Sequence, residues 1–317
     1  IFGESHGESI GVVIDGCPAG ITIKEDDFAS DILRRKGGKA GTTKRIESDK
    51  PIIKSGFFND KTTGAPIAIL FENKNINSGD YDFIKDVPRP GHADFTSMIK
   101  YNGFGDYRGG GHFSGRLTLP LVTAGVISKK ILTPMDITAK LISVDGSTDI
   151  ENAIKEATTK GDSIGGIVEC VASKIPVGLG EPFFDSIESL ISHAIFSIPA
   201  IKAIEFGVGF RGENMKGSEF NDPIIDKDGK TKTNNNGGIN GGITNGNDII
   251  FRVFVKPTPS ISIAQNTFNF KEDKISEVTI HGRHDACIAL RVPVVVEAVT
   301  SIVIADLMMI NNRITHI

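Results

Sequence analysis

Four short clusters place histidine, arginine, serine or aspartate among glycines, at residues 3–7, 89–94, 108–116 and 282–285. Glycine lets the backbone approach a ligand closely, so the polar side chains of such clusters can converge on one site. Histidine titrates near neutral pH, and arginine binds oxyanions through a planar fork of donors. Because the clusters run from the first residues to near the last, they predict one composite site for an anionic ligand.

The composition limits the kind of partner. The net charge of −4 over 317 residues disfavours nucleic-acid binding, so local arginine clusters must attract any anionic substrate. The three cysteines Cys17, Cys170 and Cys287 have no CxxC spacing, which indicates neither a disulfide framework nor a zinc motif, and we expect a reducing cytoplasm. The longest apolar stretch, residues 292–310, contains a proline and two carboxylates, which favours a buried helix over a membrane span.

The elements that position these clusters are strands and helices in mixed order. Apolar patterns predict strands at residues 12–18, 66–71, 138–145, 165–172 and 249–255. Helical periodicity predicts helices at 24–36, 118–132 and 184–196, the first with Phe28, Ile32 and Leu33 facing inward. Strands and helices do not alternate steadily as in a doubly wound parallel sheet. We therefore expect an α+β architecture in one domain over residues 1–317, with some N-terminal residues missing.

Residues 214–247 form a long segment rich in glycine, asparagine, aspartate and lysine, with few residues able to build a core. A loop of this length is either disordered or a lid over a site. The glycines beside Asn240 would let the backbone meet a cofactor, which favours the lid.

Several motifs admit other interpretations. Residues 108–116 lack the lysine-serine ending of a P-loop, and residues 207–212 match a dinucleotide fingerprint that no helical pattern follows. His281 and His284 raise metal binding, although their spacing fits no standard zinc or iron site. A phosphate- or nucleotide-binding module without catalysis is therefore a second hypothesis, and a metal hydrolase is a third.

The four clusters, together with residues 161–166 and 178–182, resemble the signatures of the chorismate synthase family in order and wording over nearly the whole chain. The resemblance implies a β-α-β sandwich, with helices between two antiparallel sheets, assembled as a homotetramer. It implies a lyase that converts 5-enolpyruvylshikimate 3-phosphate into chorismate and phosphate by a 1,4-anti elimination, with reduced FMN and no net oxidation. NADPH is a candidate reductant for the flavin. We expect no metal, nucleic acid or membrane partner.

The same resemblance implies roles for single residues. The catalytic set has a histidine beside the leaving phosphate, a histidine near the flavin, an aspartate that helps flavin N5 act as a base, and two serines near the flavin: His6, His92, Asp285, Ser114 and Ser5. The substrate-binding arginines are Arg35, Arg89, Arg116 and Arg283. The flavin contacts are His112, Phe113, Ser114, Pro199, Ala200, Gly241, Lys256, Pro257, Thr258, Pro259, Ser260 and Arg283.

The chain departs from the family's pattern at two points. Many members have Arg-Ser-Ser-Ala-Arg where residues 112–116 read His-Phe-Ser-Gly-Arg, so a titratable histidine replaces one cationic contact. Many members also carry a second arginine shortly after the one that matches Arg35. At that place this chain offers Lys39, Lys44 or Arg45.

Overall fold

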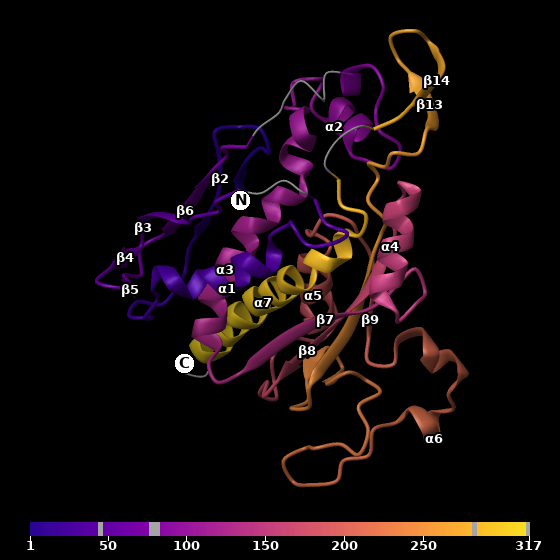
Figure 1. Ribbon diagram of the computed structural model, residues 1–317. Helices are drawn as coiled ribbons and strands as arrows, with labels where there is room; N and C mark the ends of the chain where they lie inside the picture. Colours follow the sequence, from indigo (N-terminus) through magenta and orange to yellow (C-terminus); the bar gives the residue numbers. More distant parts are fainter. Residues whose placement is uncertain (44–46, 76–82, 281–283, 315–317) are drawn as a thin grey trace.

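The computed structural model describes residues 1–43, 47–75, 83–280 and 284–314, and it contains two four-stranded antiparallel sheets (Figure 1). The first sheet has the order β1 (Phe2–Gly3), β2 (Ser9–Ile14), β6 (Ile67–Glu72) and β3 (Ile52–Ser55). The second has the order β7 (Asp136–Val144), β8 (Gly166–Ser173), β12 (Ile249–Val255) and β9 (Ile201–Phe206). The predicted α+β class is confirmed.

A layer of helices lies between the two sheets, and it is formed by α1 (Ala29–Arg35), α3 (Thr118–Leu132), α5 (Ile187–Ile195) and α7 (Pro293–Ile314). In this layer α3 packs on β2 of the first sheet, while α7 packs on β7 and β8 of the second. The arrangement is the sandwich that the family resemblance implies. Outside it lie α2 (Asp94–Lys100), α4 (Ile150–Lys160), α6 (Gly217–Phe220) and the hairpins β4–β5 (Phe57–Phe58, Lys61–Thr62), β10–β11 (Ile239–Asn240, Ile243–Thr244) and β13–β14 (Gln265–Asn269, Lys274–Val278).

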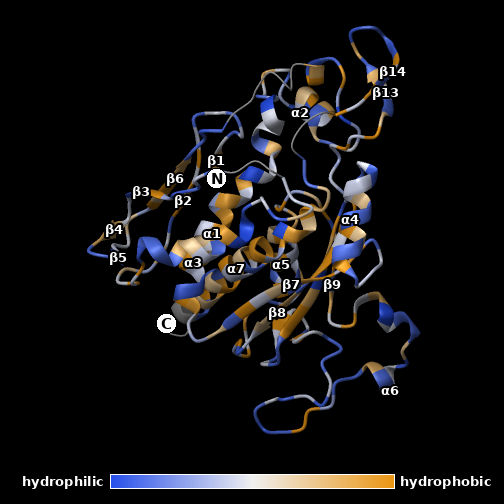
Figure 2. Cartoon of the chain, viewed as in Figure 1, coloured by the Kyte–Doolittle hydropathy of each residue, from blue (hydrophilic) through white to orange (hydrophobic). Residues whose placement is uncertain are grey.

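The helix α7 forms the centre of the sandwich. Its length and apolar composition would suffice to cross a membrane, but 61% of that apolar stretch is buried inside the protein. Apolar residues run along α7 and along the strands of the second sheet beside it (Figure 2). Against α3 the approach is close, because a Cβ on Gly125 would lie 2.3 Å from the Cβ of Ala298. The predicted buried helix in this region is confirmed.

The N-terminal helix differs from its prediction in the orientation of Leu33. A 3₁₀ turn, Glu25–Phe28, precedes α1, and Phe28 and Ile32 are buried as expected. Leu33, however, is 65% exposed, so its predicted inward orientation is wrong. Residues three apart share one face of a helix, and Arg35 occupies the inward position that follows Ile32. The helix therefore buries a cation at its end, beside the cavity described below.

Candidate active site

A cavity of about 740 Å³ lies where the end of α1, the starts of α3 and α7, and the chain after β12 meet. Its size falls within the range of roughly 300–1,000 Å³ that is typical of small-molecule sites. All four polar clusters contribute to its wall, through Ser5, through Arg89 and His92, through Gly109 and residues 112–116, and through Asp285. The structure thus brings together the composite site that the sequence predicts.

Most of the predicted site residues line this cavity. They are Ser5, Arg35, Arg89, His92, His112, Phe113, Ser114, Arg116, Pro199, Ala200, Lys256, Thr258, Pro259, Ser260 and Asp285. Lys39, Pro257 and Gly241 are described but do not line it. Arg283, Lys44 and Arg45 lie outside the described residues, so their predicted places in the site stay predictions.

The glycine run in the third cluster separates the two candidate catalytic histidines. Gly109 and Gly110 have positive φ angles of 60° and 82°, which glycine adopts without strain. A Cβ on Gly109 would lie 2.4 Å from His6 Cδ2, and one on Gly110 would lie 3.2 Å from His92 Cε1. His6 is buried behind Gly109 and is not part of the cavity wall, whereas His92 is. The run therefore needs glycine because a histidine ring lies against each of these two residues.

Two of the predicted substrate arginines are held by one carboxylate. Asp49 lies 2.9 Å from Nη1 of Arg116 and 3.8 Å from Nη1 of Arg35, and all three side chains are nearly fully buried. Arg116 also donates from Nε to Oδ1 of Asn73. Its Nη2 is buried and has no hydrogen-bond partner among the described residues. A buried donor without a partner is costly, and Arg116 lines the cavity, so its guanidinium is a candidate contact for an oxyanion.

The described residues that line the cavity carry a net positive charge, although the net charge of the whole chain is negative. Six cationic side chains line it, against three carboxylates: Arg35, Lys36, Arg89, Arg116, Lys256 and Arg291, against Glu47, Asp49 and Asp285. Burial, followed by the nearby charge of Arg291, lowers the pKa of Arg35 to about 9. Arg35 therefore stays protonated at neutral pH, and an anion in the cavity would offset the repulsion between the two guanidinium groups.

A second buried carboxylate fixes two further residues of the wall, Arg89 and His92. Asp94 accepts from Nε of Arg89 at 2.7 Å, and its other oxygen lies 2.6 Å from Nδ1 of His92. Nη1 of Arg89 also donates to Ser260 Oγ at 3.2 Å. Burial acts to raise the pKa of Asp94, but hydrogen bonds from Arg89 and His92 outweigh it and hold that pKa below its ordinary range. Arg89 and His92 are thereby oriented before any ligand arrives.

We expect Asp94→Asn to lower the free energy of unfolding by about 3–5 kcal/mol at pH 7, because Arg89 is left as an uncompensated buried charge. The pKa of Asp94 is lower in the folded protein than in the unfolded chain, where it is about 3.9. Its contribution to stability is therefore complete above the unfolded pKa and is lost as the pH falls through the folded pKa. The gap between the parent and the variant should stay constant from pH 7 to about 5 and shrink below about 4. Denaturant unfolding at several pH values measures it.

Asp106→Asn is the matched control for this experiment, since Asp106 pairs with Arg108, whose side chain is 43% exposed. Its loss should cost at most about 1 kcal/mol, as for other exposed ion pairs. A gap for Asp94→Asn that widens as the pH falls from 7 to 5 would instead assign the effect to the pairing of this carboxylate with a protonated histidine, because such a pairing becomes stronger at low pH.

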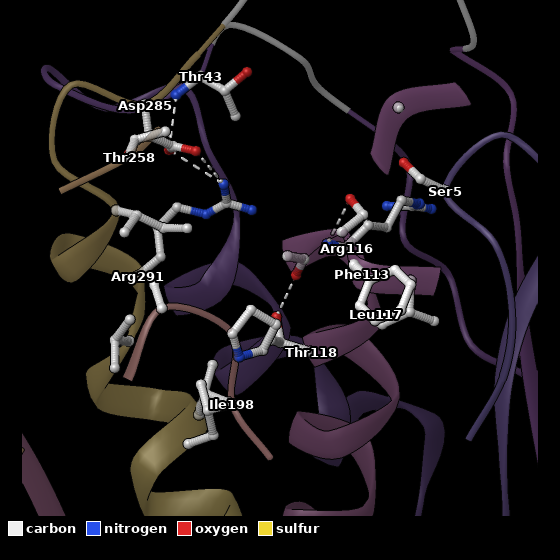
Figure 3. A pocket seen from close by; sticks show the side chains of 18 of the residues that line it. Ser5, Thr43, Phe113, Arg116, Leu117, Thr118, Ile198, Thr258, Asp285 and Arg291 are labelled. Atoms are coloured by element: carbon white, nitrogen blue, oxygen red, sulfur yellow. Dashed lines mark hydrogen bonds and ion pairs between the residues drawn. The ribbon is translucent and has the colours of Figure 1, made fainter. Parts of the chain in front are cut away.

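Asp285 is held from two sides. Oδ1 accepts from the backbone N–H of Thr43 at 3.0 Å, and Nη1 of Arg291 lies 3.1 Å from Oδ2 (Figure 3). Arg291, Asp49 and Asp94 are members of the site for which the sequence motifs predict no role. An arginine in the otherwise apolar stretch 286–296 was a usable signal, because arginine is seldom buried without a partner.

Residues 214–247 do not form a lid over this cavity. They connect the end of β9 to the start of β12, whereas the start of β9 and the chain after β12 line the cavity. No residue of the segment contributes to the cavity wall. The Asp222 carboxylate organises the segment by accepting from the backbone N–H groups of Asn235 and Asn236 at 2.8 and 2.9 Å. Gly241 therefore lies at the far end of the second sheet and does not line this cavity, and its predicted contact with the flavin stays a prediction.

Comparison with known proteins decides the family. A family model described as chorismate synthase matches residues 1–309. The chain belongs to the chorismate synthase family. It is 60% identical to the chorismate synthase of Chitinophaga pinensis over 99% of this chain and 95% of that protein. It is 47% identical to the chorismate synthase of Pyrococcus abyssi over 96% of this chain and 94% of that protein.

A crystal structure of a chorismate synthase superposes with a TM-score of 0.75 at 27% identity, covering 98% of this chain and 90% of that one. The chorismate synthase resemblance predicted from the sequence is confirmed, and with it a lyase of aromatic amino-acid biosynthesis. The alternative of a binding module without catalysis is not favoured.

Proposed function

We propose that this chain removes phosphate from 5-enolpyruvylshikimate 3-phosphate by a 1,4-anti elimination to give chorismate, with reduced FMN bound in the cavity. The observation that carries the proposal is the buried Arg116, which lines the cavity beside Arg35 and whose Nη2 has no partner among the described residues. The substrate has one phosphate and two carboxylates. A locally positive cavity with a buried free donor suits such an anion.

The residues of the cavity also fit the cofactor. The Oγ1 of Thr258 is buried without a hydrogen-bond partner in the described part of the chain, so it is a second polar atom placed for a ligand. Phe113 gives an apolar surface for a flavin ring, while Lys256 and Ser260 give donors for its phosphate. When bound, reduced FMN would supply electron density for C–O cleavage and a base for the proton at C6 of the substrate.

The remaining chemistry falls to the side chains. Arg35, Arg89 and Arg116 would bind and orient the substrate's anionic groups, each as a fork of donors. His6, through its position behind Gly109, would stabilise the charge that develops on the leaving phosphate. Asp285 would take up or relay the proton that leaves C6, because its carboxylate lines the same cavity.

We further propose that the enzyme is a cytoplasmic homotetramer and that NADPH can serve as the reductant of its flavin. The three cysteines are free, buried thiols, which is compatible with a reducing compartment. The negative net charge argues against nucleic acid as a partner. Analytical ultracentrifugation of the purified chain tests the oligomeric state directly.

The decisive experiment is chorismate formation under anaerobic conditions with reduced FMN, measured with and without NADPH. We expect equal amounts of chorismate and phosphate, and we expect His6→Ala to lower turnover by about ten- to ten-thousand-fold without unfolding the protein. His193→Ala is the control, since His193 is exposed on α5 and does not line the cavity. Substrate binding without chorismate from the parent protein would favour the non-catalytic module.

A further inference from the structure

The guanidinium of Arg291 connects two parts of the candidate active site, the end of α1 and Asp285. Its Nε donates to the main-chain oxygen of Arg35 at 2.8 Å, and its Nη1 lies 3.1 and 3.2 Å from the two oxygens of Asp285. Arg291 and Asp285 are only 17% and 11% exposed, respectively. One side chain therefore ties the backbone of a predicted substrate-binding arginine to the candidate proton acceptor. Figure 3 shows its contact with Asp285.

The same carboxylate is attached to the chain that follows α1. Asp285 accepts from the N–H of Thr43, and two residues farther on Cys287 donates to the carbonyl of Gly41 at 3.0 Å. The contacts thus close a ring that runs from Arg35 through Arg291 and Asp285 to Thr43 and back along the chain. These linked contacts restrict the distance between the Asp285 carboxylate and the end of α1, because a shift of either one would strain the hydrogen bonds of the other.

The charge of Arg291 also acts on the site. After burial, it is the largest influence that lowers the pKa of Arg35, so the two guanidinium groups repel each other in the absence of a ligand. Asp285 offsets part of this repulsion, as does Asp49. Two of the three guanidinium nitrogens of Arg291, Nε and Nη1, nevertheless donate to protein groups.

We infer that Arg291 is a positioning residue, which holds the Asp285 carboxylate and the end of α1 in the fixed relation that proton removal requires. The inference rests on the proposed function for its catalytic consequence. It assigns Arg291 no contact with the reacting atoms. Replacing Arg291 should therefore lower turnover only because it displaces the Asp285 carboxylate, and it should have little effect when that carboxylate is absent.

The first test is a double-mutant cycle. Arg291→Gln should lower kcat by about 10- to 100-fold and change KM by less than about fivefold. In the Asp285→Asn background the same change should lower kcat by less than about threefold, because residues that act as a unit are strongly non-additive. Arg291→Lys should restore part of kcat, since one ammonium can replace the charge but cannot reach both partners.

The second test needs neither substrate nor flavin. Amide hydrogen exchange at residues 41–43 should be faster in Arg291→Gln, because the acceptor of the Thr43 N–H is no longer fixed. The control is Arg252→Gln. Arg252 is 18% exposed, pairs with Glu169 at 2.9 Å and donates to the carbonyl of Gly207, but it does not line the cavity. It should change neither this exchange nor kcat by more than about twofold.

Equal losses of kcat in the two backgrounds, a loss confined to KM, or unchanged exchange at residues 41–43 would each overturn the inference. A parent protein that forms no chorismate would instead refute the proposed function. In that case the exchange experiment still decides whether Arg291 fixes Asp285, so the two failures are distinguishable.

Discussion

Asp285→Asn is expected to lower turnover by about a hundredfold or more while substrate and FMN bind at least as tightly as in the parent. Asparagine can still accept from the N–H of Thr43, so the local fold should persist. It cannot take up a proton as the carboxylate does. Removing a negative charge also favours a trianionic ligand in a cavity that Arg291 and Arg35 already make positive.

The measurement pairs anaerobic turnover with substrate affinity from the flavin spectral change. Asp31→Asn is the matched control, because Asp31 is similarly buried, at 14% exposure, and pairs with Lys129 at 2.7 Å away from the cavity. Weakened binding with unchanged turnover in Asp285→Asn would show that the carboxylate is a structural partner of Arg291 and has no part in catalysis.

Arg116→Ala is expected to weaken substrate binding by about a hundred- to a thousandfold, in keeping with the loss of one partner from a buried charge pair. The variant leaves Asp49 without its closest cation and removes the free Nη2 from the cavity. Arg116→Lys should lose about tenfold, because one ammonium cannot serve Asn73, Asp49 and a ligand at once.

Titration of each variant with the substrate, and competition with inorganic phosphate, measures these losses. Arg108→Ala serves as the control, since Arg108 precedes the same glycine run but is 43% exposed and does not line the cavity. Should Arg116→Lys bind like the parent, the planar fork is not used for the ligand. The lysine variant keeps the test valid even if the alanine variant fails to fold.

Apolar patterns predicted the framework well where burial decides the structure. The boundaries of α3 and β12 match the predicted ranges 118–132 and 249–255, because both elements are predominantly apolar and each ends shortly before a proline. The helix at 24–36 was predicted with the wrong inward residue. A pattern that counts only apolar side chains had no means of placing the buried cation Arg35 in the core.

The candidate site was predicted through its motifs, and of the members that were missed, Asp94 and Arg291 pair locally with Arg89 and Asp285. Asp49, in contrast, pairs with Arg116 across 67 residues. Local spacing carries no information about such pairs. The same limit explains the segment 214–247, whose polar composition suggested a lid. Its position depends on the order of strands in the sheet, which places it at the end opposite the cavity.

The last turn of α1 gives two adjacent arginines opposite environments. Arg34 reaches Glu297 with both terminal nitrogens, at 2.6 and 2.7 Å, while Arg35 is buried beside the cavity. Successive helical residues point about 100° apart. A substitution in α1 changes one side chain, but a single inserted residue between Ile32 and Arg34 would move Arg34 into the buried position that Arg35 now occupies and displace Arg35 from it. The length of this short helix is therefore constrained, in addition to the identity of its residues.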